Sequence, residues 1–172
     1  LDLPSTMGTA DLAVGDWVLT NPAEGLVVSL LERHTELKHP IAGIATKYQL
    51  IAANVDTLMI VSSCNADFNP ARLERYLALA ATSGTTPLLV LTKVDLATDA
   101  KEFLEKAQRL SPLADAVAID SLDKTSLNRL QPWVMPGQTV ALVGSSGVGK
   151  STILNGLAGM QTATQTIRED DA

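Results

Sequence analysis

The sequence predicts an α/β fold in which a small N-terminal β-barrel precedes a doubly wound, mainly parallel sheet. Before about residue 50 the apolar segments are short and are interrupted by turn residues, among them Asn21, Pro22 and Gly25, as is typical of short barrel strands. From residue 51 onward, apolar runs alternate with helical stretches. We therefore divide the chain into a barrel domain, residues 1–50, and an α/β domain, residues 51–172.

Each element of the α/β part has a local signature. Four apolar runs have the length and composition of buried strands: 56–63, 87–91, 116–119 and 139–143. Helices are predicted over residues 69–82 and 99–110, and another through residues 153–157. The first of them has a capping Asn69 followed by Pro70, and Gly84 closes it.

Residues 144–151 read Gly-Ser-Ser-Gly-Val-Gly-Lys-Ser, and we call them the glycine-rich loop. Glycine adopts positive φ easily, so successive backbone N–H groups can turn around phosphate oxygens at the start of the next helix. Lys150 would place an ammonium on the outer phosphates, and the Ser151 hydroxyl would ligate the Mg²⁺ that bridges them. The predicted phosphate-site residues are Gly144, Ser145, Ser146, Gly147, Val148, Gly149, Lys150, Ser151 and Thr152. A simple glycine-rich turn is the alternative interpretation.

A second segment, Thr92-Lys93-Val94-Asp95, follows the predicted strand 87–91 and resembles the NKxD motif with which GTPases recognise guanine. The aspartate of that motif accepts hydrogen bonds from the guanine ring N–H and exocyclic amine, which adenine cannot supply. We assign base recognition to Asp95, stacking of an aliphatic stem on the base to Lys93, and packing beneath the strand to Val94. Thr92 replaces the usual Asn, and its hydroxyl can make only some of an amide's contacts. Taken alone, the segment also fits a polar strand end followed by a helix cap.

The segment 92–95 precedes the glycine-rich loop, whereas ordinary GTPases carry the two motifs in the opposite order. This order predicts a circularly permuted domain, which is tolerable because domain termini often lie close together at the surface. Between the two motifs, Asp120, Ser121 and Leu122 follow the predicted strand 116–119, where GTPases carry a loop whose backbone touches the base. We expect segment 120–122 to lie at the site and assign it no side-chain role.

Together the barrel region, residues 52–56, residues 72–77, segment 92–95 and the glycine-rich loop resemble the small ribosomal subunit biogenesis GTPase family over nearly the whole chain. The resemblance implies an OB-fold for the barrel and a circularly permuted P-loop GTPase domain after it. It also implies hydrolysis of GTP to GDP and phosphate, with Mg²⁺, in late maturation of the small ribosomal subunit. The small subunit and its rRNA are the partners that it implies.

Family members continue after the phosphate loop into a switch segment, a DxxG motif and a zinc-binding domain. None of these patterns occurs before Ala172, and the first residue is Leu1 instead of Met. We therefore expect a part of a longer protein, truncated before the switch and zinc-binding regions, with zinc only in a C-terminal domain outside this chain. Such a part should bind nucleotide but hydrolyse it poorly.

Composition restricts the remaining function classes. The formal net charge is −6, and residues 1–50 hold three basic against six acidic residues, which is not the footprint of a nucleic-acid-binding domain. RNA binding thus rests on the resemblance. The single cysteine, Cys64, excludes an intramolecular disulfide and is interpreted as a buried structural thiol. No apolar run approaches the ~20 residues of a membrane helix, and no leader is present, so we expect a cytoplasmic monomer without membrane contact.

Two other functions stay open on the sequence. One is a nucleotide-sensing RNA-binding or assembly module with negligible turnover. The other is a P-loop ATPase or small-molecule kinase in which segment 92–95 is coincidental. Measured turnover separates the first from a GTPase, and base selectivity separates the second.

Overall fold

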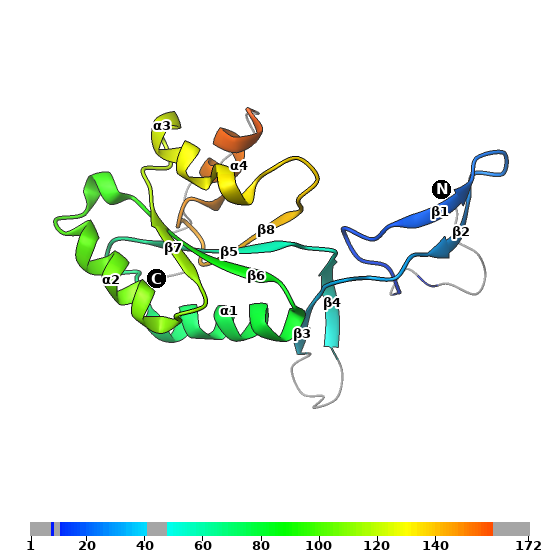
Figure 1. Ribbon diagram of the computed structural model, residues 1–172, viewed down its shortest axis with the longest axis horizontal. Helices are drawn as coiled ribbons and strands as arrows, with labels where there is room; N and C mark the ends of the chain where they lie inside the picture. Colours follow the sequence, from blue (N-terminus) through cyan, green and yellow to red (C-terminus); the bar gives the residue numbers. More distant parts are fainter. Residues whose placement is uncertain (1–7, 9–10, 41–47, 160–172) are drawn as a thin grey trace.

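The computed structural model describes residues 8, 11–40 and 48–159. Its centre is a four-stranded parallel sheet with the order β7-β6-β5-β8 (Figure 1). The strands are β5 (Thr57–Ser63), β6 (Thr86–Thr92), β7 (Asp115–Ala118) and β8 (Val140–Val143). Every residue of β5 is buried, as expected of a central strand in a parallel sheet covered on both faces. The four strands predicted from the apolar runs are confirmed.

Helices cover both faces of this sheet, as Figure 1 shows, so the doubly wound arrangement is confirmed. On one face lie α1 (Pro70–Ser83) and α2 (Ala100–Leu110). On the other lie α3 (Lys124–Leu127), the 3-10 helix η3 (Asn128–Trp133) and α4 (Lys150–Ala158).

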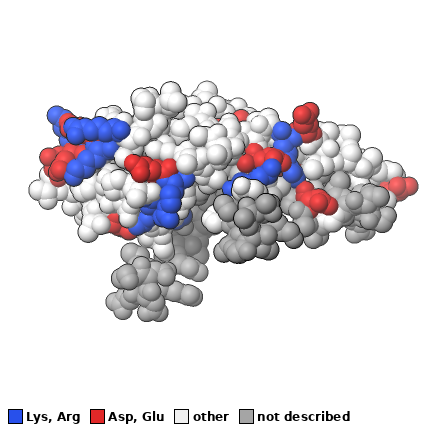
Figure 2. Space-filling view, turned by 90° about the horizontal axis from the view of Figure 1, so that it is seen from below, with Lys and Arg blue, Asp and Glu red and all other residues white. Residues whose placement is uncertain are grey.

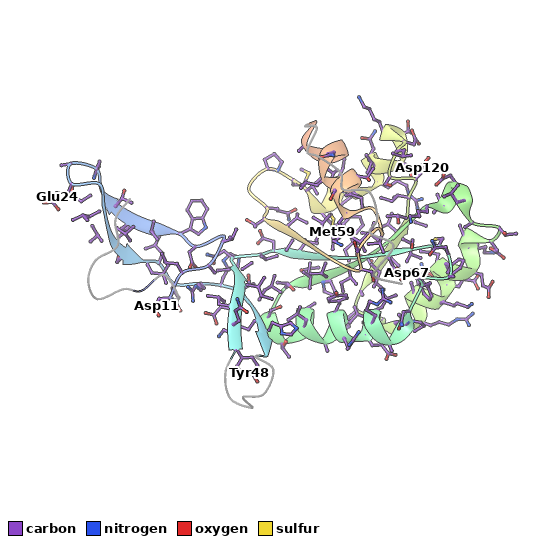
Figure 3. All side chains as sticks on the ribbon, turned by 180° about the vertical axis from the view of Figure 1, so that it is seen from behind. Asp11, Glu24, Tyr48, Met59, Asp67 and Asp120 are labelled. Atoms are coloured by element: carbon purple, nitrogen blue, oxygen red, sulfur yellow. The ribbon has the colours of Figure 1, made fainter. Side chains whose placement is uncertain are left out.

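Alternation along β5 explains the two layers. Leu58 and Ile60 pack with the α1 and α2 side, whereas Met59 and Val61 pack with the opposite side. Figure 3 labels Met59 within this sandwich. Full burial of one such side chain contributes roughly 1.5–3 kcal/mol, so the β5 residues anchor both halves of the core.

The helix ends agree with their sequence signals. The Asn69 side chain accepts a hydrogen bond from the Arg72 N–H at 3.0 Å, and Pro70 follows as the first helical residue of α1. Gly84 ends α1 in the left-handed conformation with φ 75°, and its N–H donates to the Ala80 carbonyl. These are local interactions, which is why the sequence alone located them.

The region before residue 50 is built from short strands, as predicted. β1 (Val18–Asn21) pairs with β2 (Leu26–Leu30), and β3 (Glu36–Pro40) pairs with β4 (Tyr48–Ala53), each pair antiparallel. In the part of the chain that the structure describes, they form two separate two-stranded sheets, and closure into one barrel is not seen. Figure 1 shows β1–β2 projecting away from the α/β body, with β3–β4 between them beside α1.

A buried asparagine joins the β-strand region to the α/β body. Asn54 is 2% exposed and holds φ 54°, a left-handed conformation that few residues other than glycine adopt. Its side-chain oxygen accepts from the His34 N–H at 3.0 Å, and its amide donates to the Gly15 carbonyl at 2.9 Å. Asn54 therefore ties two N-terminal segments to the residues that lead into β5.

The charges visible on one side of the molecule are mixed. In Figure 2, basic and acidic side chains lie next to one another over the described surface. Ion pairs one helical turn apart also lie along α2, for example Lys106 with Glu102 at 2.8 Å. In residues 8, 11–40 and 48–159, no helix combines the length and the apolar character needed to cross a membrane.

Candidate nucleotide-binding site

The glycine-rich loop leaves the carboxyl end of β8 and leads directly into α4, which begins at Lys150. Gly144, Gly147 and Gly149 have φ values of 147°, 73° and 96°, all in the range that glycine tolerates best. Because α4 begins at Lys150, Ser151 and Thr152 lie in its first turn, where helical N–H groups and the helix dipole favour an anion.

The loop is pressed against the neighbouring strand. A Cβ atom on Gly144 would lie 2.2 Å from the carbonyl oxygen of Val61, in β5. A Cβ atom on Gly149 would lie 3.5 Å from the Ser121 hydroxyl and 3.7 Å from side-chain atoms of Thr92. Gly149 thus lies beside segment 92–95 and segment 120–122, so the structure brings together all three segments that the sequence singled out.

Thr92 is the link between two of these segments. It is fully buried at the end of β6, and its hydroxyl lies 2.7 Å from the Val148 carbonyl and 3.2 Å from the Ser62 carbonyl. Its own carbonyl accepts from the Cys64 N–H at 2.9 Å. The end of β6 is therefore fastened to the glycine-rich loop on one side and to the end of β5 on the other.

The chain turns outward directly after Thr92. Lys93 has φ 58°, a conformation that costs a non-glycine residue of order 1 kcal/mol. The 3-10 helix η2 (Val94–Leu96) follows, and Asp95 is exposed within it. Val94 is half-buried and packs against the core on the α1 and α2 side, as the sequence predicted for that residue.

Segment 120–122 lies at the same edge of the sheet. The Ile119 N–H donates to the Leu91 carbonyl at 2.7 Å, which keeps the chain after β7 beside β6. Asp120, labelled in Figure 3 near α3, accepts the Leu122 N–H at 2.9 Å, while its own N–H donates to the Ser126 hydroxyl at 2.9 Å. The carboxylate of Asp120 is thus engaged in shaping its own loop.

Lys150 points back into the glycine-rich loop. Its ammonium donates to the Gly144 carbonyl at 2.9 Å and to the Ser145 carbonyl at 2.5 Å. Burial lowers the pKa of Lys150 below its ordinary value, because the charged form loses water contacts. An ammonium held over a glycine-rich loop at the N-terminus of a helix attracts a polyanion such as a nucleotide phosphate chain.

Few side chains in the described residues could ligate a metal ion. No group of three or more His, Cys, Asp or Glu side chains in those residues could hold a metal ion. Ser151 is exposed in the first turn of α4 and directly follows Lys150 in the sequence. One hydroxyl at the end of the glycine-rich loop is compatible with Mg²⁺, a cation that usually retains several waters and few protein ligands.

Strand β5 contributes backbone groups to the site that the sequence did not indicate. The Val61 and Ser62 carbonyls support the loop and Thr92, and the Ser63 hydroxyl hydrogen bonds to the Asn65 side chain at 2.8 Å just beyond. The available signal was the small polar pair Ser62 and Ser63, which ends the apolar segment 56–63. Cys64, directly after this pair, is 2% exposed, and burial raises the pKa of its thiol to about 11, so its interpretation as a buried structural thiol is confirmed.

A groove elsewhere on the surface has different character. It has a volume of about 730 Å³ and lies between the β3–β4 pair and α1. Two of its cations are already paired, because Arg33 binds Asp16 at 2.6 Å and Lys38 binds Glu36. The groove is not lined by the glycine-rich loop or by segments 92–95 and 120–122.

Comparison with known proteins places this site in context. Residues 30–172 match the sequence model of a family described as RsgA GTPase. A small ribosomal subunit biogenesis GTPase RsgA from Mesorhizobium japonicum is 51% identical over 176 aligned residues, covering 100% of this chain and 51% of that protein. A protein of the same name from Methanosarcina acetivorans is 46% identical over 164 residues, covering 92% and 44%. The chain spans about half the length of these curated relatives.

Solved structures show the same fold. The crystal structure of YjeQ from Thermotoga maritima superposes with a TM-score of 0.67 at 25% identity, over 90% of this chain and 54% of that one. The crystal structure of YloQ, described as a circularly permuted GTPase, gives a TM-score of 0.58 at 28% identity, over 83% and 48%. The α/β fold with permuted motif order is therefore confirmed.

Proposed function

The chain belongs to the RsgA GTPase family, and from that premise we propose that it forms the guanine-nucleotide-binding part of a GTPase. The complete protein would hydrolyse GTP to GDP and phosphate and act in late maturation of the small ribosomal subunit, in the cytoplasm. The relatives' printed names support this proposal, since they describe small ribosomal subunit biogenesis GTPases.

One observation carries the nucleotide proposal. The glycine-rich loop, segment 92–95 and segment 120–122 converge at the carboxyl edge of the parallel sheet, joined by the hydrogen bond from Thr92 to Val148. Ligands of open α/β sheets bind at this edge, outside the carboxyl ends of the strands. A phosphate-binding loop and a base-reading segment at one edge match the two ends of a nucleotide.

Each group of site residues would contact a different part of the bound nucleotide. The loop N–H groups, the α4 terminus and the Lys150 ammonium would hold the phosphates and stabilise charge that develops on them. The Ser151 hydroxyl would hold Mg²⁺, which neutralises phosphate charge when it is bound. Asp95 would accept the guanine N–H groups, with the Lys93 stem against the base plane. The backbone of segment 120–122 would close the other side of the base pocket.

The partners of the whole protein belong to the same proposal. We keep the division into an N-terminal OB-fold, residues 1–50, and a permuted GTPase domain from residue 51, with zinc in a domain outside this chain. Binding to rRNA draws little support from electrostatics, because the charges on the face in Figure 2 are interspersed and the net charge is −6. Contact with the ribosomal subunit would then depend on shape and on local groups. We propose that the protein acts as a monomer.

Calorimetric titration of the chain with GDP, GTP and ATP in the presence of Mg²⁺ tests the nucleotide proposal. We expect GDP and GTP to bind and ATP to bind far more weakly, because adenine leaves the Asp95 carboxylate without donors. Equal affinity for ATP would remove the guanine assignment and favour a P-loop ATPase.

Single-turnover hydrolysis by the full-length protein tests the enzymatic proposal. The GTP cleavage rate would be measured with and without small ribosomal subunits. We expect cleavage to be faster with subunits present. Guanine-selective binding without cleavage in either condition would favour a nucleotide-sensing assembly module instead.

A further inference from the structure

Arg129, in η3, contacts the last peptide group before segment 120–122. Its guanidinium Nη1 donates a hydrogen bond to the Ala118 carbonyl at 2.6 Å. The N–H of the same peptide group, which belongs to Ile119, donates to the Leu91 carbonyl of β6 at 2.7 Å. The C=O and N–H of a trans peptide group point in opposite directions. Strand β6 therefore holds this peptide group from one side and Arg129 holds it from the other.

The guanidinium supplies a partner that the sheet does not. In the part of the chain that the structure describes, β7 is an outer strand and pairs with β6 alone. The outward carbonyl groups of such a strand have no neighbouring strand to donate to them. Arg129 donates to one of them at Ala118, the last residue of β7 and two positions before Asp120.

The element that carries Arg129 is anchored in the core. Leu127 of α3 is 4% exposed and Leu130 of η3 is 0% exposed, and both pack in the core on the α4 side of the sheet. The approach of α3 to α4 is close, because a Cβ atom on Gly156 would lie 2.2 Å from a methyl carbon of Leu127. Figure 1 shows α3 beside α4. Arg129 therefore extends from a fixed support.

A second side chain of the same support holds segment 120–122. The Ser126 hydroxyl, three positions before Arg129, accepts the Asp120 N–H at 2.9 Å. The Asp120 carboxylate in turn accepts the Leu122 N–H at 2.9 Å. Arg129 and Ser126 thus fix the backbone that enters the segment, and the Asp120 carboxylate fixes the backbone at its end.

We propose that Arg129 is a positioning residue for the base pocket: through the Ala118 carbonyl it holds the backbone of segment 120–122 in place. This inference rests on the proposed function where nucleotide affinity is the readout. Because Arg129 is exposed, water can replace the guanidinium at that carbonyl. Loss of Arg129 therefore loosens the segment without leaving a buried acceptor unpaired, so the fold keeps its stability.

The test compares Arg129→Met, which keeps a long stem and removes the donors, with Lys124→Met, which removes a cation from the exposed start of α3. In the full-length protein without nucleotide, hydrogen exchange of the Ile119 and Leu122 amides reports loosening directly. With Mg²⁺ present, titration calorimetry gives the affinities for GDP and for inorganic pyrophosphate, which has no base. The ratio of these affinities measures the base pocket separately from the glycine-rich loop.

We expect Arg129→Met to speed the exchange of both amides and to weaken GDP binding about threefold, the effect of one exposed charge-assisted hydrogen bond. Pyrophosphate affinity should not change, and Lys124→Met should match the unaltered protein in all these quantities. Unchanged exchange in Arg129→Met would overturn the proposal. Equal losses of GDP and pyrophosphate affinity would also overturn it, because they would indicate a general charge effect.

Urea unfolding separates positioning of the segment from loss of stability. The midpoint for Arg129→Met should equal that of the unaltered protein. A much lower midpoint, or failure of the variant to fold, would overturn the proposal, because Arg129 would then support the fold as a whole. If the unaltered protein fails to bind GDP, the proposed function fails, while exchange of the Ile119 amide without nucleotide still decides whether Arg129 holds the segment.

Discussion

The ammonium of Lys150 lies 2.9 Å from the carbonyl oxygen of Gly144, so the last part of the glycine-rich loop is closed onto its first residue. Backbone carbonyl groups of the loop therefore hold the Lys150 side chain in place. Hydrogen bonds to the loop carbonyls fix the position of the ammonium. Burial lowers the pKa of Lys150 below its ordinary value. An ammonium that is held by carbonyl oxygens can exchange them for phosphate oxygens, which form stronger, charge-assisted hydrogen bonds.

Replacing this lysine should abolish most phosphate affinity. Lys150→Met keeps the length of the side chain and removes the charge, and we expect GDP affinity to fall roughly 10- to 100-fold, the size of a hydrogen bond to a charged group. Titration calorimetry measures it. Lys124→Met, on the exposed start of α3, is the matched control and should bind GDP normally. Similar losses in both variants would indicate a general charge effect.

Asp95 should set base selectivity. Asp95→Asn replaces an acceptor pair with an amide that can donate to the additional oxygen of xanthine, so preference should move from GTP toward xanthosine triphosphate. Competition titration with both nucleotides gives the ratio. Asp99→Asn serves as the control, because Asp99 caps α2 by accepting the Glu102 N–H at 3.0 Å and lies outside the proposed site. An unchanged ratio in Asp95→Asn would remove Asp95 from the base pocket.

Gly144 should tolerate no side chain. A Cβ there would overlap the Val61 carbonyl at 2.2 Å, and because both partners are backbone, the loop would have to move away from β5. We expect Gly144→Ala to lower the free energy of unfolding by about 2 kcal/mol or more and to weaken GDP binding. Urea unfolding and titration measure the two effects.

Comparing Gly144 with Gly137 separates the cost of steric overlap from the cost of the left-handed backbone conformation. Gly137 also has positive φ, 88°, but a Cβ there would meet nothing within 4 Å. Gly137→Ala should therefore cost only about 1–2 kcal/mol for the left-handed conformation and leave nucleotide affinity unchanged. If both alanine variants bound GDP equally well, the close approach of the loop to β5 would be irrelevant to binding.

The Arg33–Asp16 pair should make stability depend on pH. The Asp16 side chain is 4% exposed, and the guanidinium donates to its carboxylate at 2.6 and 2.7 Å. This hydrogen bonding lowers the pKa of Asp16 below its ordinary 3.8. A lowered carboxyl pKa contributes stability that is present above the ordinary value and is lost as the pH falls through the folded-state pKa.

Arg33→Met leaves that partly buried carboxylate without its partner and should cost about 1–3 kcal/mol near neutral pH. Since protonation neutralises the stranded charge, the difference in unfolding free energy between the variant and the unaltered protein should narrow from pH 6 to about pH 3. Urea unfolding across this range measures it. Lys38→Met, which breaks a half-exposed pair with Glu36, should cost under about 1 kcal/mol. A constant difference at every pH would show that the pair contributes through packing alone.

In the N-terminal region, local sequence patterns predicted strands but could not predict the long-range contacts between them. Short segments and turn residues indicated strands, and strands are present. The sequence could not reveal that Asn54 would bind Gly15, a residue 39 positions earlier, or that β4 would run to Ala53. Those features depend on which segments meet in space.

By itself the sequence determined the alternation of strands and helices, the caps at Asn69 and Gly84, and a glycine-rich loop between a strand and a helix. It also determined the permuted order of the two motifs. These are properties of neighbouring residues, whose conformations follow from side-chain shape, glycine φ freedom and apolar periodicity.

Only the tertiary structure decided how those parts act on one another. The Thr92 hydroxyl reaches the Val148 carbonyl across 56 positions of sequence, and the loop rests on the Val61 carbonyl of a strand that precedes it by more than eighty residues. Such contacts exist because the order β7-β6-β5-β8 sets β5 between the strand that ends at Thr92 and the strand that leads to Gly144. Strand order is a property of the packed core, where many weak interactions together select one arrangement, and no single stretch of residues encodes it.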